Sequence, residues 1–303
     1  MFSLNAAGSF IQNSTLKIQN LTMRIHLVTY ATPRFRLRQL ILGWSALANK
    51  VVDTVTHWSP EKLQAAGFEN RCPGIKLSER GSGFWAWKPF VIDLKLQEVV
   101  EGDIVFYCDV GRLYPFKLLN QTITPYLQWM NKNGQDIMPG VKIPWDGPNS
   151  AWIKREALVA HDMDRPEVHL AAPIQASFSL WRVSTASRNF VEKWLHSCSQ
   201  RPLVSDDASR HGLTELSGFR GHRHDQALLT LHCIAAGIDG LGIGTEKPHI
   251  DSRHPSQVSR IAFGVTTNGA TLAGRMLNAF VKPIELSEKI LRQNLKFGKT
   301  FNE

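Results

Sequence analysis

The sequence predicts an α/β fold, a mostly parallel sheet of the Rossmann-like type that is flanked by helices. Strand and helix patterns alternate in the order β-α-β-α-β over the first 110 residues, and this order is typical of parallel, doubly wound sheets with right-handed crossovers. In addition, residues 104–108 form a continuous apolar run, as expected of a strand that is covered on both faces. With 303 residues and 43% hydrophobic content, the chain is long enough to bury a large core.

The N-terminal elements follow in chain order. Residues 24–30 are an apolar strand, 35–49 a helix, 51–55 a second strand and 60–66 a short helix. Residues 67–83 are polar and rich in Gly and Pro, which indicates a loop.

The stretch 80–111 carries the strongest functional signal. A helix is expected at 89–100, with Pro89 in its first turn, and the buried strand 104–108 follows it. Asp109 comes directly after that strand, and Gly111 permits a sharp turn. Since ligands of open α/β sheets bind beyond the carboxyl ends of the strands, Asp109 is a candidate site residue. The alternative is that 109–111 is only a polar turn.

Beyond residue 111 the pattern is less regular. Helices with short strands between them are expected at 115–130, 153–160, 184–197 and 224–236. We expect a poorly ordered leader at 1–22, one domain at 23–275 with halves at 23–115 and 116–275, and a separate C-terminal helix at 276–303.

Composition limits the class of protein. No run of about 18 apolar residues is present, so no membrane span is expected. The four cysteines are scattered without a CxxC pair, which argues against a zinc ribbon or a disulfide framework and fits a reducing cytoplasm. The formal charge of +9 suits an anionic partner such as a nucleotide diphosphate or an acidic membrane surface. Because no nucleic-acid-binding signature accompanies the charge, no nucleic-acid partner is expected.

A second cluster of polar side chains lies just before the apolar helix 224–236. Asp225 falls in the first turn of that helix, where a negative charge is favoured. His222 and His224 would project to one face of an extended segment, and two imidazoles at this spacing could ligate a divalent metal. The alternative is that both histidines are polar loop residues and that Asp225 only stabilises the helix start.

Together these motifs resemble the GT-A-type glycosyltransferases that use nucleotide-diphospho-sugars. The resemblance rests on RGSGFWAWKP at 80–89, GDIVFYCDVG at 102–111 and HRHDQ at 222–226, and it extends over roughly 24–255. It is nearest to uncharacterised bacterial glycosyltransferase-like proteins and is distantly similar to glycogenin.

The resemblance implies roles for individual residues. Asp109 would take the place of the strand-end Asp that binds metal and diphosphate, while Asp225 and Gln226 would match the Asp-Gln pair at the reaction centre. Candidate nucleotide contacts are the cations Arg80 and Lys88 together with Asp109, Gly111, Thr29 and Tyr30.

A departure from the family pattern affects the expected Mn²⁺ or Mg²⁺ cofactor. Gly111 stands where the second Asp of the Asp-x-Asp motif would be. Three alternatives remain. Either His222 or His224 joins Asp109 as a metal ligand, or the metal is bound mainly by the diphosphate. In the third alternative no metal is used, and Arg80 and Lys88 neutralise the phosphates.

The sequence therefore predicts a cytoplasmic glycosyltransferase that moves a sugar from a nucleotide-sugar donor to a glycan or lipid-linked acceptor in bacterial glycan or polysaccharide synthesis. A catalytically inactive nucleotide-sugar binding module is the alternative. The basic C-terminal helix at 276–303 is expected to pack on the domain, with peripheral contact to an anionic membrane as the alternative interpretation.

Overall fold

The computed structural model describes residues 23–110 and 123–242. The expected leader at 1–22, the C-terminal helix at 276–303 and Gly111 lie outside the described residues. The rest of this section concerns the described part of the chain.

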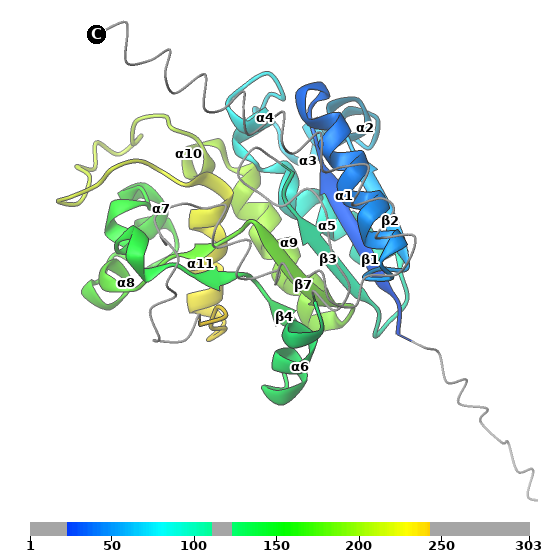
Figure 1. The fold of residues 1–303 in the computed structure, drawn as a ribbon. Coiled ribbons are helices and arrows are strands. Elements are labelled where there is room, and N and C mark those ends of the chain that lie inside the picture. The colour runs from blue at the N-terminus through cyan, green and yellow to red at the C-terminus, as the bar shows by residue number, and fades with distance from the viewer. Residues whose placement is uncertain (1–22, 111–122, 243–303) are drawn as a thin grey trace, which may run out of the picture.

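A five-stranded sheet forms the centre of the molecule (Figure 1). β1 pairs in parallel with both β2 and β3, whereas β7 is antiparallel to β3 and to β4. Four of the five strands therefore run in one direction, which confirms the predicted α/β fold with a mostly parallel sheet. In spatial order the strands are β2 (Thr54–Trp58), β1 (Ile25–Tyr30), β3 (Ile104–Cys108), β7 (Phe178–Arg182) and β4 (Ile137–Met138).

Helices cover both faces of this sheet. α1 (Arg36–Ala48) and α6 (Thr124–Lys132) share one core with Leu27 and Phe106, while α5 (Trp87–Glu98), α9 (Thr185–Ser199) and α11 (His224–Ala235) share the other with Val105 and Tyr107. Because successive side chains of β3 point to opposite faces and both faces are covered, all five of its residues are buried.

Shorter elements connect and extend these layers. They are η1 (Pro33–Phe35), α2 (Pro60–Ala65), α3 (Phe68–Arg71), α4 (Gly81–Phe84), β5 (Val141–Lys142), η2 (Pro144–Asp146), η3 (Asn149–Ala151), α7 (Arg155–Ala160), α8 (Pro166–Leu170), β6 (Ile174–Gln175) and α10 (Arg201–Val204). β5 and β6 form a separate two-stranded antiparallel sheet.

The element boundaries differ from the predicted ones at a few places. β2 begins at Thr54 rather than at Val51, because Val51 and Val52 are buried in the loop that enters the strand. α5 begins two residues earlier than expected, at Trp87. The segment 67–83, predicted as a loop, contains the one-turn helix α3.

Two of the composition-based expectations can be compared with the described residues. No helix within 23–110 or 123–242 is long and apolar enough to cross a bilayer. All four cysteines fall in these ranges, and each of them is free and buried, which agrees with the prediction of no disulfide framework.

Helix α9 begins with a reciprocal cap. The Ser184 hydroxyl accepts a hydrogen bond from the Ser187 backbone N–H at 3.2 Å, and the Ser187 hydroxyl accepts one from the Ser184 N–H at 3.1 Å. These bonds satisfy two donors that the first turn of a helix otherwise leaves unpaired.

We predict that Ser184→Ala lowers the free energy of unfolding by about 1 kcal/mol, the usual cost of losing such a cap. Ser199→Ala is the matched control, because that hydroxyl lies at the other end of α9 and only donates to the His196 carbonyl. Chemical denaturation measures both variants. Equal losses would show that the cap has no special role.

Candidate active site

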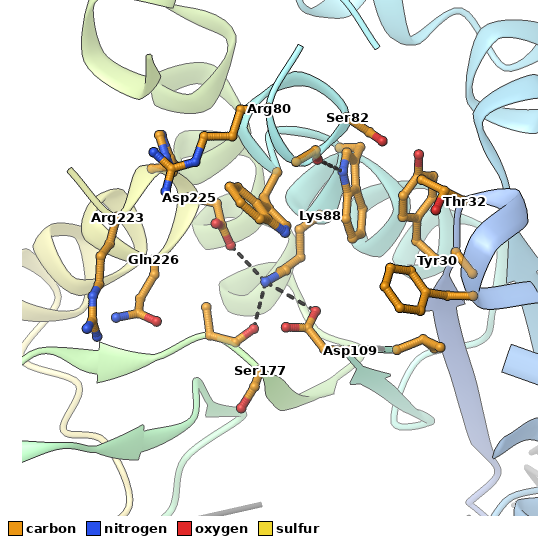
Figure 2. A pocket seen from close by; sticks show the side chains of 18 of the residues that line it. Tyr30, Thr32, Arg80, Ser82, Lys88, Asp109, Ser177, Arg223, Asp225 and Gln226 are labelled. Carbon is orange, nitrogen blue, oxygen red and sulfur yellow. Dashed lines mark hydrogen bonds and ion pairs between the residues drawn. The ribbon is translucent and has the colours of Figure 1, made fainter. Parts of the chain in front are cut away.

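A cavity opens at the carboxyl ends of β1 and β3 (Figure 2), where Tyr30 ends β1 and Asp109 follows β3. Its volume is about 450 Å³. This is the edge of the sheet at which open α/β folds bind ligands. The lining residues are Tyr30, Ala31, Thr32, Phe35, Arg80, Gly81, Ser82, Trp85, Trp87, Lys88, Asp109, Val110, Ala176, Ser177, His222, Arg223, His224, Asp225 and Gln226.

The Lys88 ammonium lies at the centre of the polar groups in this pocket (Figure 2). Lys88 is in the first turn of α5, and its side chain is only 4% exposed. Its Nζ is 2.9 Å from the Asp225 carboxylate and 3.4 Å from the Asp109 carboxylate, and it donates to the Ala176 carbonyl at 2.8 Å. A buried ammonium requires such partners, because its desolvation is otherwise very costly.

Opposing effects determine the pKa values of these groups. Burial alone would lower the pKa of Lys88, but Asp109 and Asp225 outweigh it and raise the value, so the lysine stays charged. Burial raises the pKa of Asp225 to about 6, against the opposing effect of Lys88. It also raises the pKa of Asp109, with Lys88 and Tyr107 opposing. At neutral pH the cluster thus combines a charged Lys88 with an Asp225 carboxylate that is mostly ionised.

Two buried aromatic residues hold the carboxylates in place. The Tyr107 hydroxyl, on β3, donates to the Asp109 carboxylate. The Trp194 indole N–H, on α9, donates to the backbone carbonyl of Asp225 at 3.0 Å and so anchors the first turn of α11. Both rings are fully buried, so the positions of the carboxylates are fixed by the core.

The loop before α5 has an unusual backbone. The five residues 81–85 all have positive φ, including the non-glycine residues Ser82, Phe84 and Trp85. Such a run is rare and strained for L-residues, and strain of this kind is often found at functional sites. The loop places the Trp85 ring against His224, with ring centroids 5.3 Å apart.

Trp85 and Trp87 have different roles. Trp87 is buried in the core, and the centroid of its ring lies 3.9 Å from that of Tyr30. Trp85 is only partly buried and lines the pocket. It is therefore an aromatic side chain of the pocket wall, with its ring stacked on His224.

Two arginines lie at the pocket wall. Arg80 is 63% exposed and pairs with Asp206 at 3.0 Å. Arg223 pairs with Asp146, and its guanidinium stacks on Trp152 at 3.7 Å from the ring centroid. The Arg80 pair is exposed, and such pairs contribute little stability and exchange partners easily, so its guanidinium could instead bind an anion. The Arg223 pair is half-buried and is held more firmly by Trp152.

The other predicted site residues are divided between pocket and core. Gln226 lines the pocket, and its buried Nε2 has no hydrogen-bond partner in the described structure. Tyr30 lines it through its ring. Thr29 is fully buried within β1 and is not part of the lining. The structure therefore brings together Tyr30, Arg80, Lys88, Asp109, Asp225 and Gln226.

Of the two predicted histidine ligands, only His224 keeps a ring nitrogen without a hydrogen-bond partner in the described structure, its buried Nε2. In His222, Nδ1 accepts from the Lys154 N–H and Nε2 donates to the Leu203 carbonyl, so no ring nitrogen is left for a metal. In His224, Nδ1 donates to the Val204 carbonyl. Burial lowers the pKa of both rings. No group of three or more His, Cys, Asp or Glu in the described part of the chain could hold a metal ion.

The hydrogen bonds of His222 and of His224 Nδ1 fit the alternative that both histidines are structural. Both rings tie the start of α11 to α10, through the carbonyls of Leu203 and Val204. The space beside Asp109 that a metal would need holds the Lys88 ammonium. A requirement for Mn²⁺ or Mg²⁺ stays a prediction.

Several pocket residues were not predicted. Ala176 and Ser177 reach the site because β7 runs antiparallel to β3, and the Asp109 N–H donates to the Ser177 carbonyl. Arg223 and Tyr107 lie within the quoted motifs but were not assigned a role. Tyr107 could have been found from its spacing, since residues two apart on a strand share a face and Tyr107 is two residues before Asp109.

Comparisons with known proteins identify no family for the chain. No protein-family model matches the chain, and no curated protein sequence matches it. Among solved structures, the chain is similar to the apo structure of the bifunctional glycosyltransferase WbbM, with a TM-score of 0.37 and 9% identity over 70% of this chain. The chain spans 38% of the length of that protein. A similarity this distant concerns the fold only.

We predict that Gly81→Ala destabilises the loop and displaces Trp85. A Cβ at this position would overlap the Trp85 ring, whereas Gly74 has a similar φ of +83° and no atom within 4 Å of its Cβ position. Gly74→Ala, the control, should cost only the backbone strain, about 1 kcal/mol. The Gly81 variant should lose more stability in thermal melts and change near-ultraviolet circular dichroism. Identical behaviour of the two variants would contradict the steric argument.

We also predict a pH dependence of stability that comes from Asp225. Its pKa is about 6 in the folded chain against an ordinary value of 3.8, so between these values the folded state binds more protons than the unfolded state. The free energy of unfolding therefore decreases as pH rises through this window. Denaturation at several pH values should give a smaller slope for Asp225→Asn than for the native chain. An unchanged slope would contradict the raised pKa.

Proposed function

We propose that the chain is a glycosyltransferase that moves a sugar from a nucleotide-diphosphate donor to an acceptor hydroxyl. The observation that carries the proposal is the buried Lys88 ammonium between Asp109, at the end of β3, and Asp225, at the start of α11. It forms part of the wall of a pocket that also presents Trp85, Arg80 and Arg223. The sequence motifs that resemble GT-A enzymes contribute these same residues.

The charges in the pocket suit a nucleotide-diphosphate donor. Sugar transfer releases a diphosphate, and preorganised cations stabilise the negative charge that develops on it. Because Lys88 is already paired with Asp109 and Asp225, further positive charge must come from the pocket wall. Arg80 and Arg223 supply it, and a guanidinium can contact two phosphate oxygens at once. Lys88 acts as the fixed point charge beside them.

The carboxylates and Gln226 suit the sugar and the acceptor. Asp225 is ionised above about pH 6 and can accept the proton of an acceptor hydroxyl while the acceptor oxygen bonds to the anomeric carbon. The bond from that carbon to the diphosphate breaks, and its electron pair leaves with the phosphate. The unpaired Nε2 of Gln226 is a donor for a sugar oxygen. We further propose a glycan or lipid-linked acceptor for this reaction.

A thermal-shift screen followed by a turnover assay tests the proposal. A ligand that binds only the folded state raises its melting temperature. UDP-, GDP-, CMP- and dTDP-sugars are compared, each with Mn²⁺ and with EDTA. We expect one nucleotide class to stabilise the chain and the matching nucleotide to be released when an acceptor is added. Stabilisation without any turnover would favour the inactive binding module, and no stabilisation by any donor would contradict the proposal.

We predict that Lys88→Met lowers kcat/KM for the identified donor by at least 100-fold, the typical effect of removing one preorganised charge. Lys95→Met is the matched control, since Lys95 is a buried lysine of the same helix that pairs with Glu98 outside the pocket. Release of the nucleoside diphosphate measures activity, and melting temperatures check folding. Comparable activity losses in two folded variants would show that Lys88 has no specific role.

A further inference from the structure

The outer face of α1 is an exposed apolar stripe. Leu37, Trp44 and Leu47 are 56%, 51% and 42% exposed, and Leu40 is partly exposed between them. Their spacing of i, i+3, i+7 and i+10 puts all four on one side of the helix. Seven large apolar residues are this exposed in the described part of the chain. Three of them lie on this single helix, so the stripe is not a random scatter.

The charged residues of the segment that contains this stripe are all positive. Residues 23–52 contain five Lys or Arg residues and no Asp or Glu. Arg34 before the helix and Lys50 after it are both exposed, so a cation lies beyond each end of the stripe. Of the nearby carboxylates, Glu61 bonds to Ser59 and lies close to Arg36, and Asp53 accepts from the Ile25 N–H. The surface of α1 itself is therefore apolar and basic.

The stripe also begins at the edge of the pocket. Thr32 and Phe35 line the cavity, and Phe35 directly precedes α1. The Arg34 guanidinium lies over the Phe35 ring, 5.7 Å from its centroid. Whatever binds the outer face of α1 is consequently brought close to the pocket mouth.

We propose that the outer face of α1, made of Leu37, Leu40, Trp44 and Leu47, docks on an anionic lipid surface. A helix with an apolar face and flanking cations lies in the plane of the membrane interface, with the apolar side chains at the boundary of the acyl chains. Trp is favoured at this depth, and each nearby cation is attracted by acidic headgroups. The absence of carboxylates along 23–52 favours such a surface over a basic or mixed protein partner.

This inference does not depend on the proposed reaction, but it adds to it. With α1 on the membrane, the pocket mouth lies at headgroup level, where a lipid-linked acceptor would present its hydroxyl. Vesicle binding and sugar transfer are measured separately, so either proposal can fail without the other.

Vesicle co-sedimentation of the full chain tests the docking. Native chain, Leu37→Ser/Trp44→Ser and the control Val159→Ser/Leu170→Ser are compared. The control also removes two exposed apolar side chains: Val159 of α7, which is 46% exposed, and Leu170 of α8, which is 76% exposed. We expect the native chain and the control to bind vesicles of phosphatidylcholine with phosphatidylglycerol. The α1 variant should bind at least about tenfold more weakly, because it lacks two large apolar side chains that the lipid would bury.

Measurements at high salt, on neutral vesicles and by light scattering and hydrogen exchange distinguish lipid docking from other ways of covering α1. Binding of the native chain should decrease at high salt and be weak on pure phosphatidylcholine, because the basic flanks contribute. No vesicle binding at low salt, or an equal loss in both double variants, would overturn the proposal. The proposal would also be overturned if light scattering showed that the native chain is a dimer and that only the α1 variant is not. It would equally be overturned if hydrogen exchange showed that other residues of the chain cover α1. Melting temperatures confirm that all three proteins are folded.

Discussion

The ion cluster of Lys88, Asp109 and Asp225 is the interaction on which the rest of the site depends. A buried ammonium is tolerated only when carboxylates or carbonyls surround it. Its partners come from the end of β3, the turn before β7 and the first turn of α11, while the lysine itself is on α5 (Figure 2). Segments up to 137 residues apart in the chain, by the difference between 225 and 88, are thus joined at one atom.

This constraint links the fold to the proposed chemistry. β1 and β3 must end at the same edge of the sheet, and α11 must begin there, for the cluster to form. Tyr107 and the Trp194 indole then fix the carboxylates from the core side, which leaves the other side of the cluster open to the pocket. The polar groups are positioned before any ligand arrives, and such preorganisation is what stabilises developing charge most effectively.

Sequence reasoning predicted the parts of this arrangement that depend on local patterns. The apolar run before Asp109 identified β3 and its end, and the position of Asp225 identified the start of α11, because each signal lies within a few neighbouring residues. The direction of β7 and the partners of His222 and His224 depend on contacts between distant segments. For this reason the sequence suggested that two histidines were free for a metal, whereas both ring nitrogens of His222 and Nδ1 of His224 bind backbone groups and only Nε2 of His224 has no hydrogen-bond partner in the described part of the chain.

The role of Lys88 could be predicted from the sequence only in part. Its motif indicated a phosphate-binding cation, but no local pattern indicates that the same ammonium bridges two carboxylates. Because the lysine is already paired with two carboxyl groups, the proposed diphosphate site relies on Arg80 and Arg223 at the pocket wall for further positive charge.

A crystal structure of the chain with a nucleoside diphosphate, chosen by its effect on melting temperature, tests this account most directly. The account predicts that the diphosphate lies in the pocket at the ends of β1 and β3, with phosphate oxygens within hydrogen-bond distance of Lys88 Nζ and of at least one of the two guanidinium groups. A diphosphate bound elsewhere, or bound in the pocket without contact to any of these three cations, would contradict it.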